Sequence, residues 1–363
     1  METINIDLGH TRYPIIIKPG ILNEIGGIID DIASGNKLIL ITDENVDNHY
    51  SNAIEKSLNS NFEMLKIVIS PGENSKQMDT ILNICGRMYD FGVERTSSVI
   101  AFGGGVVGDI AGFCAAIFLR GIPFIQIPTT LLACCDSSVG GKVGINFKNT
   151  KNLIGSFYQP KGVYIDPELM STLPKREMIS GLGEVIKTGL IGDSELYDLT
   201  VSNSENIINC NDMSILTKII QKSVTIKADV VNQDEKESGL RRILNFGHSI
   251  GHGIEAAAGG TFLHGEAVIV GMAAAVYISS LKKILDSQIS MQINNELKKI
   301  PVPRALQDIP FDKVNDFIKK DKKRIDNRIR FILLEQIGKP VESTEITKEN
   351  MEEAYDFTRN LFS

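Results

Sequence analysis

The sequence predicts a Rossmann-like α/β domain followed by an all-helical domain. Up to about residue 166, short β-branched runs alternate with helix-like stretches, which is the pattern of parallel βαβ units. Beyond that point, apolar residues recur at every third and fourth position, as they do in helices. A chain of 363 residues is also long for one typical core. We therefore expect two domains, residues 1–166 and residues 167–363.

The strands of the first domain are expected in five apolar runs. In chain order these are KLILITDEN, FEMLKIVISPGE, SSVIAFGGG, PFIQIPTT and GVYIDPE. Each run ends in residues that turn a chain out of a strand, such as Asp, Gly, Pro or Thr. Ligands collect at the carboxyl ends of parallel strands, so the pattern favours a nucleotide-binding domain.

The second domain is expected to consist of helices, most of them long. Its main apolar repeats are ISGLGEVIKTGLI, MSILTKIIQKSVTIKADVVNQDE and HGEAVIVGMAAAVYISSLKKIL. Pro167 and Pro174 bracket a short connector before the first of these repeats, and proline is common in a first helical turn. This connector is where we expect the two domains to meet.

Composition and charge exclude several classes of protein. The formal net charge is −7 and there is no basic tail, which argues against a nucleic-acid or anionic-membrane partner. The five cysteines show no CxxC spacing and their odd number does not suit a disulfide framework, so a reducing cytosol fits best. The N-terminal METINIDLGHTRYPIII does not resemble a secretory signal, and no apolar run reaches membrane-spanning length. We expect a cytoplasmic protein, in which any anionic ligand is held by local cationic clusters.

The segment GGGVVGD, residues 103–109, follows an apolar run and precedes a helix-like stretch. Its glycines have the GxGxxG spacing that lets a pyrophosphate approach a helix N-terminus. The acid expected on the next strand is missing, because PFIQIPTT ends in threonines. Asp43 and Asn45, after the first core strand, could bind a ribose instead. Close packing of a helix on a strand is the alternative explanation for these glycines.

A second glycine-rich segment, DSSVGGKVGIN at residues 136–146, resembles a P-loop at first sight. It departs from that motif because valine follows Lys142 and the first glycine is missing. What remains is a polar loop with a lysine, and Lys151 and Asn152 follow shortly after. Anion binding and ordinary solvated lysines are both compatible with this pattern.

Three of the five histidines, His248, His252 and His264, fall within residues 239–268. His248 and His252 have i, i+4 spacing, which places both on one helix face as in a zinc protease helix. A catalytic zinc needs a third protein ligand, and His264 or an acid could supply it. Surface or core histidines on helices are the alternative.

Glu184 lies in the apolar segment GLGEVIKTG. A carboxylate in such a segment needs a partner, either a metal or a cation. Lys187 is three residues further on and would share its helix face, so a local ion pair is as good an explanation as a metal.

Taken in order, these segments and several others resemble the 3-dehydroquinate synthases of the sugar phosphate cyclase group. The resemblance covers about residues 37–338. The matching segments are PGENSK, GGGVVGDIAGF, LRG, PTTLL, DSSVGGK, KNLIGSFYQP, TLPKRE, GEVIK, GLRRILNFGH, HGEAV and DKK. It implies an NAD-binding α/β domain, a helical metal- and substrate-binding domain, and a homodimer with active sites between domains.

By position, the resemblance implies that Glu184, His248 and His264 bind zinc, with cobalt as another possible ion. His252 corresponds to a substrate-side residue, so the i, i+4 argument nominates one histidine too many. The positions that match NAD contacts are Asp43, Asn45, Glu73, Lys76, Gly104, Gly105, Asp109, Thr129, Thr130, Asp136, Lys151, Thr172, Leu173 and Glu177. The positions that match substrate contacts are Lys142, Asn152, Lys187, Lys227, Arg241, Asn245 and His252, with Arg120 reaching across the dimer and a further lysine at Lys322 or Lys323.

The implied substrate is 3-deoxy-D-arabino-heptulosonate 7-phosphate, and the implied reaction belongs to the shikimate pathway of aromatic amino acid biosynthesis. NAD oxidises the C5 hydroxyl transiently, phosphate leaves by β-elimination, the ketone is reduced again, and the opened ring closes by an intramolecular aldol step. Lys142, Asn152 and Lys187 suit the phosphate, Arg241 and Lys227 suit the carboxylate, and His252 could relay a proton.

Three other functions deserve comparison. A 2-deoxy-scyllo-inosose synthase would share the NAD and metal parts but would cyclise a different sugar phosphate. A metal-dependent polyol dehydrogenase would release NADH, and a catalytically silent protein would only bind NAD or metal. DSSVGGK, GEVIK and the lysine set favour the dehydroquinate-forming enzyme. Cys134 and Cys135 have no role in the resemblance, and we expect them to be small buried residues.

Overall fold

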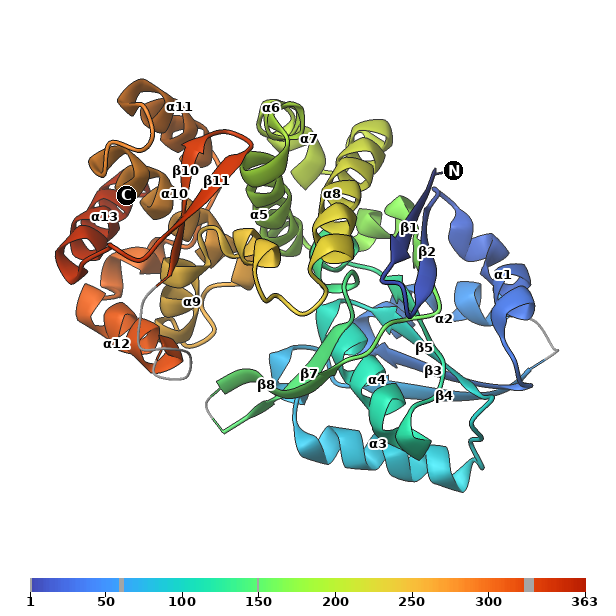
Figure 1. Ribbon diagram of the computed structural model, residues 1–363. Helices are drawn as coiled ribbons and strands as arrows, with labels where there is room; N and C mark the ends of the chain where they lie inside the picture. Colours follow the sequence, from blue (N-terminus) through green and yellow to red (C-terminus); the bar gives the residue numbers. More distant parts are fainter. Residues whose placement is uncertain (1, 59–61, 149, 323–329) are drawn as a thin grey trace. The chain divides into compact units, whose positions relative to one another are not determined.

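The computed structural model describes residues 2–58, 62–148, 150–322 and 330–363, with the backbone alone for residues 320–322 (Figure 1). Its internal contacts divide the chain into two compact units. Unit 1 comprises Met1–Leu173 and Leu216–Lys236, and unit 2 comprises Pro174–Ile215 and Glu237–Ser363. The Rossmann-like domain and the helical domain of the predicted fold class are both present.

Unit 1 is built on a seven-stranded sheet with the order β1-β2-β9-β6-β5-β3-β4. All five predicted strands are present and are parallel to their neighbours among these five. They are β3 (Lys37–Asp43), β4 (Glu63–Ile69), β5 (Ser98–Gly103), β6 (Phe124–Pro128) and β9 (Val163–Ile165). An antiparallel pair that was not predicted, β1 (Glu2–Asp7) and β2 (Arg12–Ile17), extends the sheet beyond β9.

The central strands form because their apolar runs are buried on both faces, as is usual for parallel sheets. Every residue of β5 and β6 is buried. On one face, α3 (Met78–Asp90) and α4 (Gly105–Ile117) pack into a shared core with Ile39, Ile67 and Val99 (Figure 1). The remaining helices of this unit are α1 (Ile25–Ile32), α2 (Glu44–Ser57) and most of α8 (Met213–Gln233).

The segment expected to be a polar loop around Lys142 is a β-hairpin instead. Lys142 is the first residue of β7 (Lys142–Phe147), which pairs with β8 (Thr150–Phe157). Val143 and Ile145 alternate with polar or glycine positions, and both are buried in the core beneath α4. The alternation of buried apolar residues with other residues in KVGINF is therefore the pattern of a strand. The glycines around it make this two-residue period hard to recognise in the sequence.

Unit 2 contains two of the three predicted long helices and one addition to the predicted pattern, because Leu216–Lys236 of the third helix belongs to unit 1. The helices are α5 (Lys175–Gly192), α6 (Ser194–Ser202), α7 (Ser204–Ile208), α9 (His248–Ala257), α10 (His264–Leu281), α11 (Ser287–Leu297), α12 (Phe311–Lys322) and α13 (Lys348–Leu361). The addition is an antiparallel hairpin of β10 (Phe331–Gln336) and β11 (Lys339–Ser343). Phe331 and Leu333 of this hairpin are buried in the core that also contains α9, α10, α12 and α13 residues.

Helix α10 has the length and composition of a membrane-spanning helix, with a mean hydropathy of 1.3. This finding corrects the expectation that no apolar run reaches that length. In the structure, 78% of the helix is buried within the protein, and α5, α9, α11 and α13 pack around it. A helix that is apolar on all sides is buried, and the core position of α10 explains its composition.

Helices α5 and α10 touch through glycines. A Cβ atom at Gly265 would lie 1.8 Å from the backbone oxygen of Ser180, and one at Gly183 would lie 2.6 Å from the oxygen of Gly265. The Gly265 amide donates a hydrogen bond of 3.0 Å to the Ser180 hydroxyl. Neither glycine has room for a side chain, so this sequence permits a helix contact that any larger residue would prevent.

We predict that Gly265→Ala lowers the free energy of unfolding by about 1–3 kcal/mol, because the new methyl group overlaps the α5 backbone. The midpoint of urea unfolding, followed by circular dichroism, measures this change. Gly86→Ala is the control, because nothing lies within 4 Å of a Cβ atom at this α3 position. We expect the control to be neutral or slightly stabilising. A wild-type midpoint for Gly265→Ala would show that the α5–α10 contact adapts easily.

Candidate functional site

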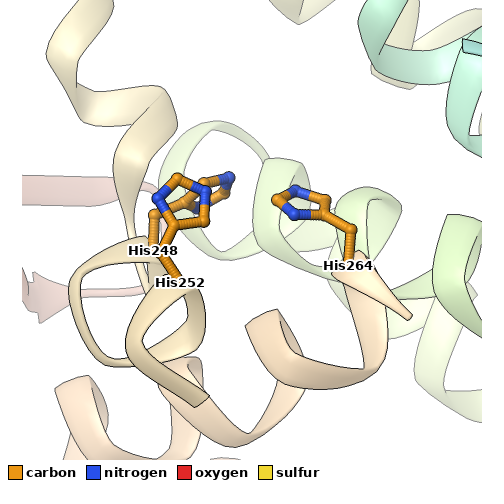
Figure 2. A group of neighbouring side chains, drawn as sticks. All are labelled: His248, His252 and His264. Atoms are coloured by element: carbon orange, nitrogen blue, oxygen red, sulfur yellow. The ribbon is translucent and has the colours of Figure 1, made fainter. Parts of the chain in front are cut away.

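The structure brings the three clustered histidines together. His248 and His252 lie one turn apart on α9, and His264 is the first residue of α10 (Figure 2). The centres of the three rings are 5.0 to 5.5 Å apart. One nitrogen of each ring can be chosen so that all three lie within 4.8 Å of one another, which is compatible with a shared metal ion.

Glu184 reaches the same place from α5. Its Oε1 atom lies 3.7 Å from Nε2 of His248 and 3.4 Å from Nε2 of His264. Glu184 is 1% exposed, and Oε1 has no hydrogen-bond partner among the described residues. A buried carboxylate oxygen without a partner is costly, and a cation placed between it and the two imidazoles would remove that cost. These residues therefore fit a metal ion.

The other contacts of His248 and His264 orient their Nε2 atoms. Nδ1 of His248 lies 3.0 Å from the Phe246 carbonyl oxygen, and Nδ1 of His264 lies 3.2 Å from Oε2 of Glu255. A ring that donates through Nδ1 presents the lone pair of Nε2, which is the usual arrangement of histidine ligands. His252 is the exposed member of the group. Proximity alone would also allow His252 to be a ligand.

The charges around this cluster favour a cation. Burial raises the pKa of Glu184, but the ammonium of Lys187 and the two imidazoles outweigh it and hold that pKa well below its ordinary value. Burial and the charge of Lys187 hold the pKa of His248 well below its ordinary value. Burial opposes the charge of His264, but Glu184 and Glu255 outweigh it and raise its pKa to about 10. The carboxylates of Glu184 and Glu255 therefore favour positive charge at His264.

An ion pair holds the chain just before His264. The guanidinium of Arg176 donates to both carboxylate oxygens of Glu266, at 2.8 and 2.7 Å, and to the Thr261 carbonyl at 2.8 Å. The Leu263 amide donates to Glu266 at 2.8 Å, which caps the first turn of α10. This role of Arg176 was not predicted from the sequence, although the residue lies in the TLPKRE segment. Glu177, predicted to contact NAD, follows it, and burial and the Glu266 charge raise the pKa of Glu177.

Three further predicted residues of unit 2, Lys187, Arg241 and Asn245, are buried or hydrogen-bonded to a neighbouring side chain. Lys187 is 1% exposed and donates to the second oxygen of Glu184. Arg241 is 2% exposed and lies in the 3-10 helix Leu240–Asn245. At the end of that helix, Asn245 donates a hydrogen bond of 2.5 Å to Glu237. Glu237 was not predicted from the sequence, since nothing in its local pattern marks it.

In unit 1, four predicted residues form one polar network. The Lys76 ammonium donates to Asp109 at 2.5 Å and to the side chain of Asn152, and lies 3.7 Å from Glu73. Asn146 completes the network by donating to Glu73 at 2.8 Å and accepting from the Asn152 amide at 2.9 Å. Burial raises the pKa of Asp109 to about 6, although Lys76 opposes this shift. The sequence analysis missed Asn146.

The glycine motif serves two purposes in the structure. A Cβ atom at Gly103 would lie 2.5 Å from Val107, and one at Gly108 would lie 3.0 Å from Gln126 of β6. These two glycines permit close helix packing, which was the alternative explanation. Gly104 and Gly105 are partly exposed at the start of α4, where backbone N–H groups have no partner within the helix. These two positions fit an anion at a helix N-terminus.

Other predicted residues lie apart or have local roles. Asp43 caps α2 by accepting hydrogen bonds from the Asn45 and Val46 amides, at 2.9 and 3.1 Å. Lys227 donates to the Asp136 carbonyl at 2.7 Å and to its carboxylate. Further positions of unit 1 are the exposed Arg120, Lys142, Lys151 and Thr172, the partly exposed Thr130 and Leu173, and the buried Thr129. Lys323 and the side chain of Lys322 lie outside the described residues. Cys134 and Cys135 are buried, as expected.

The family models and the relatives that match this chain carry the same description. The family model for the 3-dehydroquinate synthase N-terminal region matches residues 66–180, and the model for the C-terminal region matches residues 181–324. The 3-dehydroquinate synthase of Ruminiclostridium cellulolyticum is 45% identical over 340 residues, which are 93% of this chain and 94% of that protein.

Two solved structures of cyclases are similar over nearly their whole length. A 2-epi-5-epi-valiolone synthase from Streptomyces hygroscopicus, with NAD+ and Zn2+ bound, has a TM-score of 0.88 and 27% identity, covering 98% of both chains. A 2-deoxy-scyllo-inosose synthase, complexed with carbaglucose-6-phosphate, NAD+ and Co2+, has a TM-score of 0.86 and 27% identity, covering 99% of both chains. With its two matched regions and its relative at 45% identity, the chain belongs to the 3-dehydroquinate synthase family.

Proposed function

We propose that this protein converts 3-deoxy-D-arabino-heptulosonate 7-phosphate to 3-dehydroquinate and phosphate. It is then a lyase that depends on NAD and a divalent metal. The observation that carries the proposal is the buried Oε1 atom of Glu184, which lacks a hydrogen-bond partner and faces the Nε2 atoms of His248 and His264. The identity of 45% to a 3-dehydroquinate synthase supports the choice of substrate.

Glu184, His248 and His264 are the proposed metal ligands. Two imidazole nitrogens and one carboxylate suit Zn2+, and Co2+ is an alternative, as the ions of the solved cyclases suggest. A bound ion of this kind supplies Lewis-acid chemistry, because it lowers the pKa of a coordinated hydroxyl group. Glu255 positions His264, and the Phe246 carbonyl positions His248. His252 remains available to accept and return a proton at the substrate hydroxyl.

In unit 2, Lys187 and Arg241 are the proposed cationic contacts of the substrate, with Asn245 beside them. The Arg241 guanidinium suits a carboxylate, since it can donate two parallel hydrogen bonds. In unit 1, Lys142 and Asn152 are proposed to bind phosphate and Lys227 to bind the carboxylate. These assignments follow the positions that match the family.

NAD is the proposed redox cofactor, and it supplies a hydride acceptor that becomes a hydride donor later in the same turnover. Gly104 and Gly105 are proposed to bind its pyrophosphate, because they lie at the start of α4, where backbone N–H groups favour an anion. Residues 1–166 are proposed as the NAD-binding domain and residues 167–363 as the metal- and substrate-binding domain. The other proposed contacts are Asp43, Asn45, Glu73, Lys76, Asp109, Thr129, Thr130, Asp136, Lys151, Thr172, Leu173 and Glu177.

A homodimer in the cytoplasm is part of the same proposal. Exposed apolar side chains occur at the end of α4, where Ile117 and Leu119 are 44% and 43% exposed. The β7–β8 hairpin, which packs against α4, adds the exposed Phe147 and Phe157. Arg120 follows Leu119 in a left-handed conformation, with φ of 68°, and is exposed. A second copy that covers these apolar groups would place Arg120 at the interface.

The proposed activity predicts phosphate release without net formation of NADH. Purified protein, NAD+, Zn2+ and the heptulosonate phosphate are mixed, and phosphate and nicotinamide absorbance are followed in the same sample. We expect one dehydroquinate per phosphate. Sustained NADH production would instead identify a dehydrogenase, and activity on a hexose phosphate alone would identify a different cyclase.

The proposed ligand set predicts different results for the histidines. Glu184→Ala and His264→Ala should each lose bound metal and activity together. His252→Ala should keep its metal, while kcat falls by about 10²–10⁴ because a proton relay is lost. Metal content by atomic emission after gel filtration separates these cases. Loss of metal from His252→Ala would make His252 a ligand and overturn the assignment.

The contact between Glu255 and His264 predicts weaker metal binding in Glu255→Gln. Replacing a carboxylate that orients a histidine ligand lowers metal affinity by about 10–100-fold. Competition with a chromophoric chelator measures the dissociation constant without any assay of activity. Glu349→Gln is the control, because this carboxylate lies at the exposed start of α13. Equal affinity in Glu255→Gln and the wild type would show that the ring needs no such support.

A further inference from the structure

The β7–β8 hairpin of unit 1 is irregular at Asn146. The strand register shifts between Ile145 and Phe147, so that Asn146 alone lies opposite residues 151–153 of β8. Extra residues of this kind form a β-bulge, which changes the direction of side chains and is common beside active sites. Asn152, in the middle of the bulge, has a left-handed backbone with φ of 51°. Such a conformation is uncommon outside glycine and persists where the surrounding structure supports it.

The side chain of Asn146 supplies this support. Its Oδ1 atom accepts a hydrogen bond of 2.9 Å from the backbone amide of Asn152. Its Nδ2 atom donates to Glu73 at 2.8 Å, and its own backbone amide donates to the Lys76 carbonyl at 2.8 Å. Asn146 therefore ties the bulge of β8 to the segment that precedes α3.

The side chain of Asn152 is oriented by a second contact. Its Oδ1 atom accepts from the ammonium of Lys76, which is 4% exposed and also donates to Asp109 at 2.5 Å. Because the carbonyl end of the Asn152 amide faces this cation, the amino end points away from it. An amino group donates hydrogen bonds and accepts none, so the exposed Asn152 offers a donor that suits an anionic oxygen.

We propose that Asn146 is a positioning residue for the phosphate group of the substrate, and that it acts through Asn152. Asn146 holds the left-handed backbone of Asn152, Lys76 orients the side-chain amide, and the Asn152 amino group donates to a phosphate oxygen. Asn146 itself is not a phosphate contact in this proposal, because both ends of its side-chain amide already have partners. The inference rests on the proposed function in one respect, the assignment of Asn152 to phosphate.

The residue type at position 152 fits this role. Asparagine is one of the residues other than glycine that adopt a left-handed backbone most readily. Glycine would adopt it without support but would have no side chain to donate. Because the folded hairpin already holds Asn152 in this conformation, phosphate binding need not order it, and ordering at binding would lower the affinity.

The test is the binding of inorganic phosphate to the full-length protein. The protein is loaded with Zn2+, freed of excess metal and saturated with NAD+, and phosphate is titrated by calorimetry. Asn152→Gly should weaken phosphate binding by about 10-fold, because a hydrogen bond to a charged group is lost. Asn146→Ala should weaken it by about 3–10-fold, because Asn152 is no longer held. Ser156→Ala is the control, since Ser156 is exposed on the same strand β8, and it should bind phosphate as the wild type does.

A double variant shows whether Asn146 acts through Asn152. When position 152 is already glycine, Asn146→Ala should cause no further loss of phosphate affinity, because glycine needs no support and has no amide to position. Additive losses in the double variant, or wild-type phosphate affinity in Asn146→Ala, would overturn the inference.

Circular dichroism and urea unfolding of each variant separate positioning from a purely structural role. If Asn146 only stabilised the hairpin, Asn146→Ala would lower the unfolding midpoint and leave the phosphate affinity of the folded protein unchanged, and the inference would be wrong. Equal phosphate affinity in Asn152→Gly and the wild type, or no phosphate binding by the wild type, would remove the assignment of Asn152 and the inference with it. Failure of the proposed function differs from these results, because the wild type would then bind phosphate without releasing it from the heptulosonate phosphate.

Discussion

The proposed metal site depends on how closely α5 and α10 can pack. Gly183 and Gly265 leave no side chain between the two backbones, and a Cβ atom at either position would overlap the opposite helix. Glu184 follows Gly183 directly, and His264 precedes Gly265. The absence of two methyl groups therefore brings a buried carboxylate within 3.4 Å of an imidazole nitrogen. If the two helices were further apart, the same residues would be present in the sequence, but their side chains would lie too far apart to form this site.

The two carboxylate oxygens of Glu184 face different neighbours. Oε2 accepts from Lys187, and Oε1 faces His248 and His264. Lys187 stabilises the carboxylate in its ionised form, although the site is buried. A divalent ion at Oε1 therefore need not displace the lysine, since each cation has its own oxygen. The ion-pair explanation and the metal explanation, which compete when only the sequence is considered, are compatible in the structure.

The sequence predicted those parts of the fold whose signal is local and continuous. Runs such as KLILITD and SVIAFG form strands that are buried along most or all of their length, because apolar residues dominate them. The strand that begins at Lys142 was missed because glycines obscure its alternation. The three histidines were found because they lie close in sequence, whereas Arg176 and Glu266 are 90 residues apart and only the folded chain pairs them. Glu255 and Asn146 were missed because they act on other side chains.

The glycine motif shows why spacing alone could not decide between two functions. A close phosphate and a close neighbouring side chain both require a residue without a Cβ atom. Either requirement therefore places glycine at that position, and the sequence alone does not distinguish them. In the structure, Gly103 faces Val107 and Gly108 faces Gln126, while Cβ atoms at Gly104 and Gly105 would lie 2.9 Å from Thr130 and 3.0 Å from Ser137. Gly104 and Gly105 also begin α4. The spacing that defines the motif includes Gly103, Gly105 and Gly108, yet only Gly105 of these three lies at a helix start that suits an anion. Close approach to a neighbouring side chain occurs at all three glycines of the motif, so packing alone could account for its spacing, and an anion at Gly105 stays a prediction.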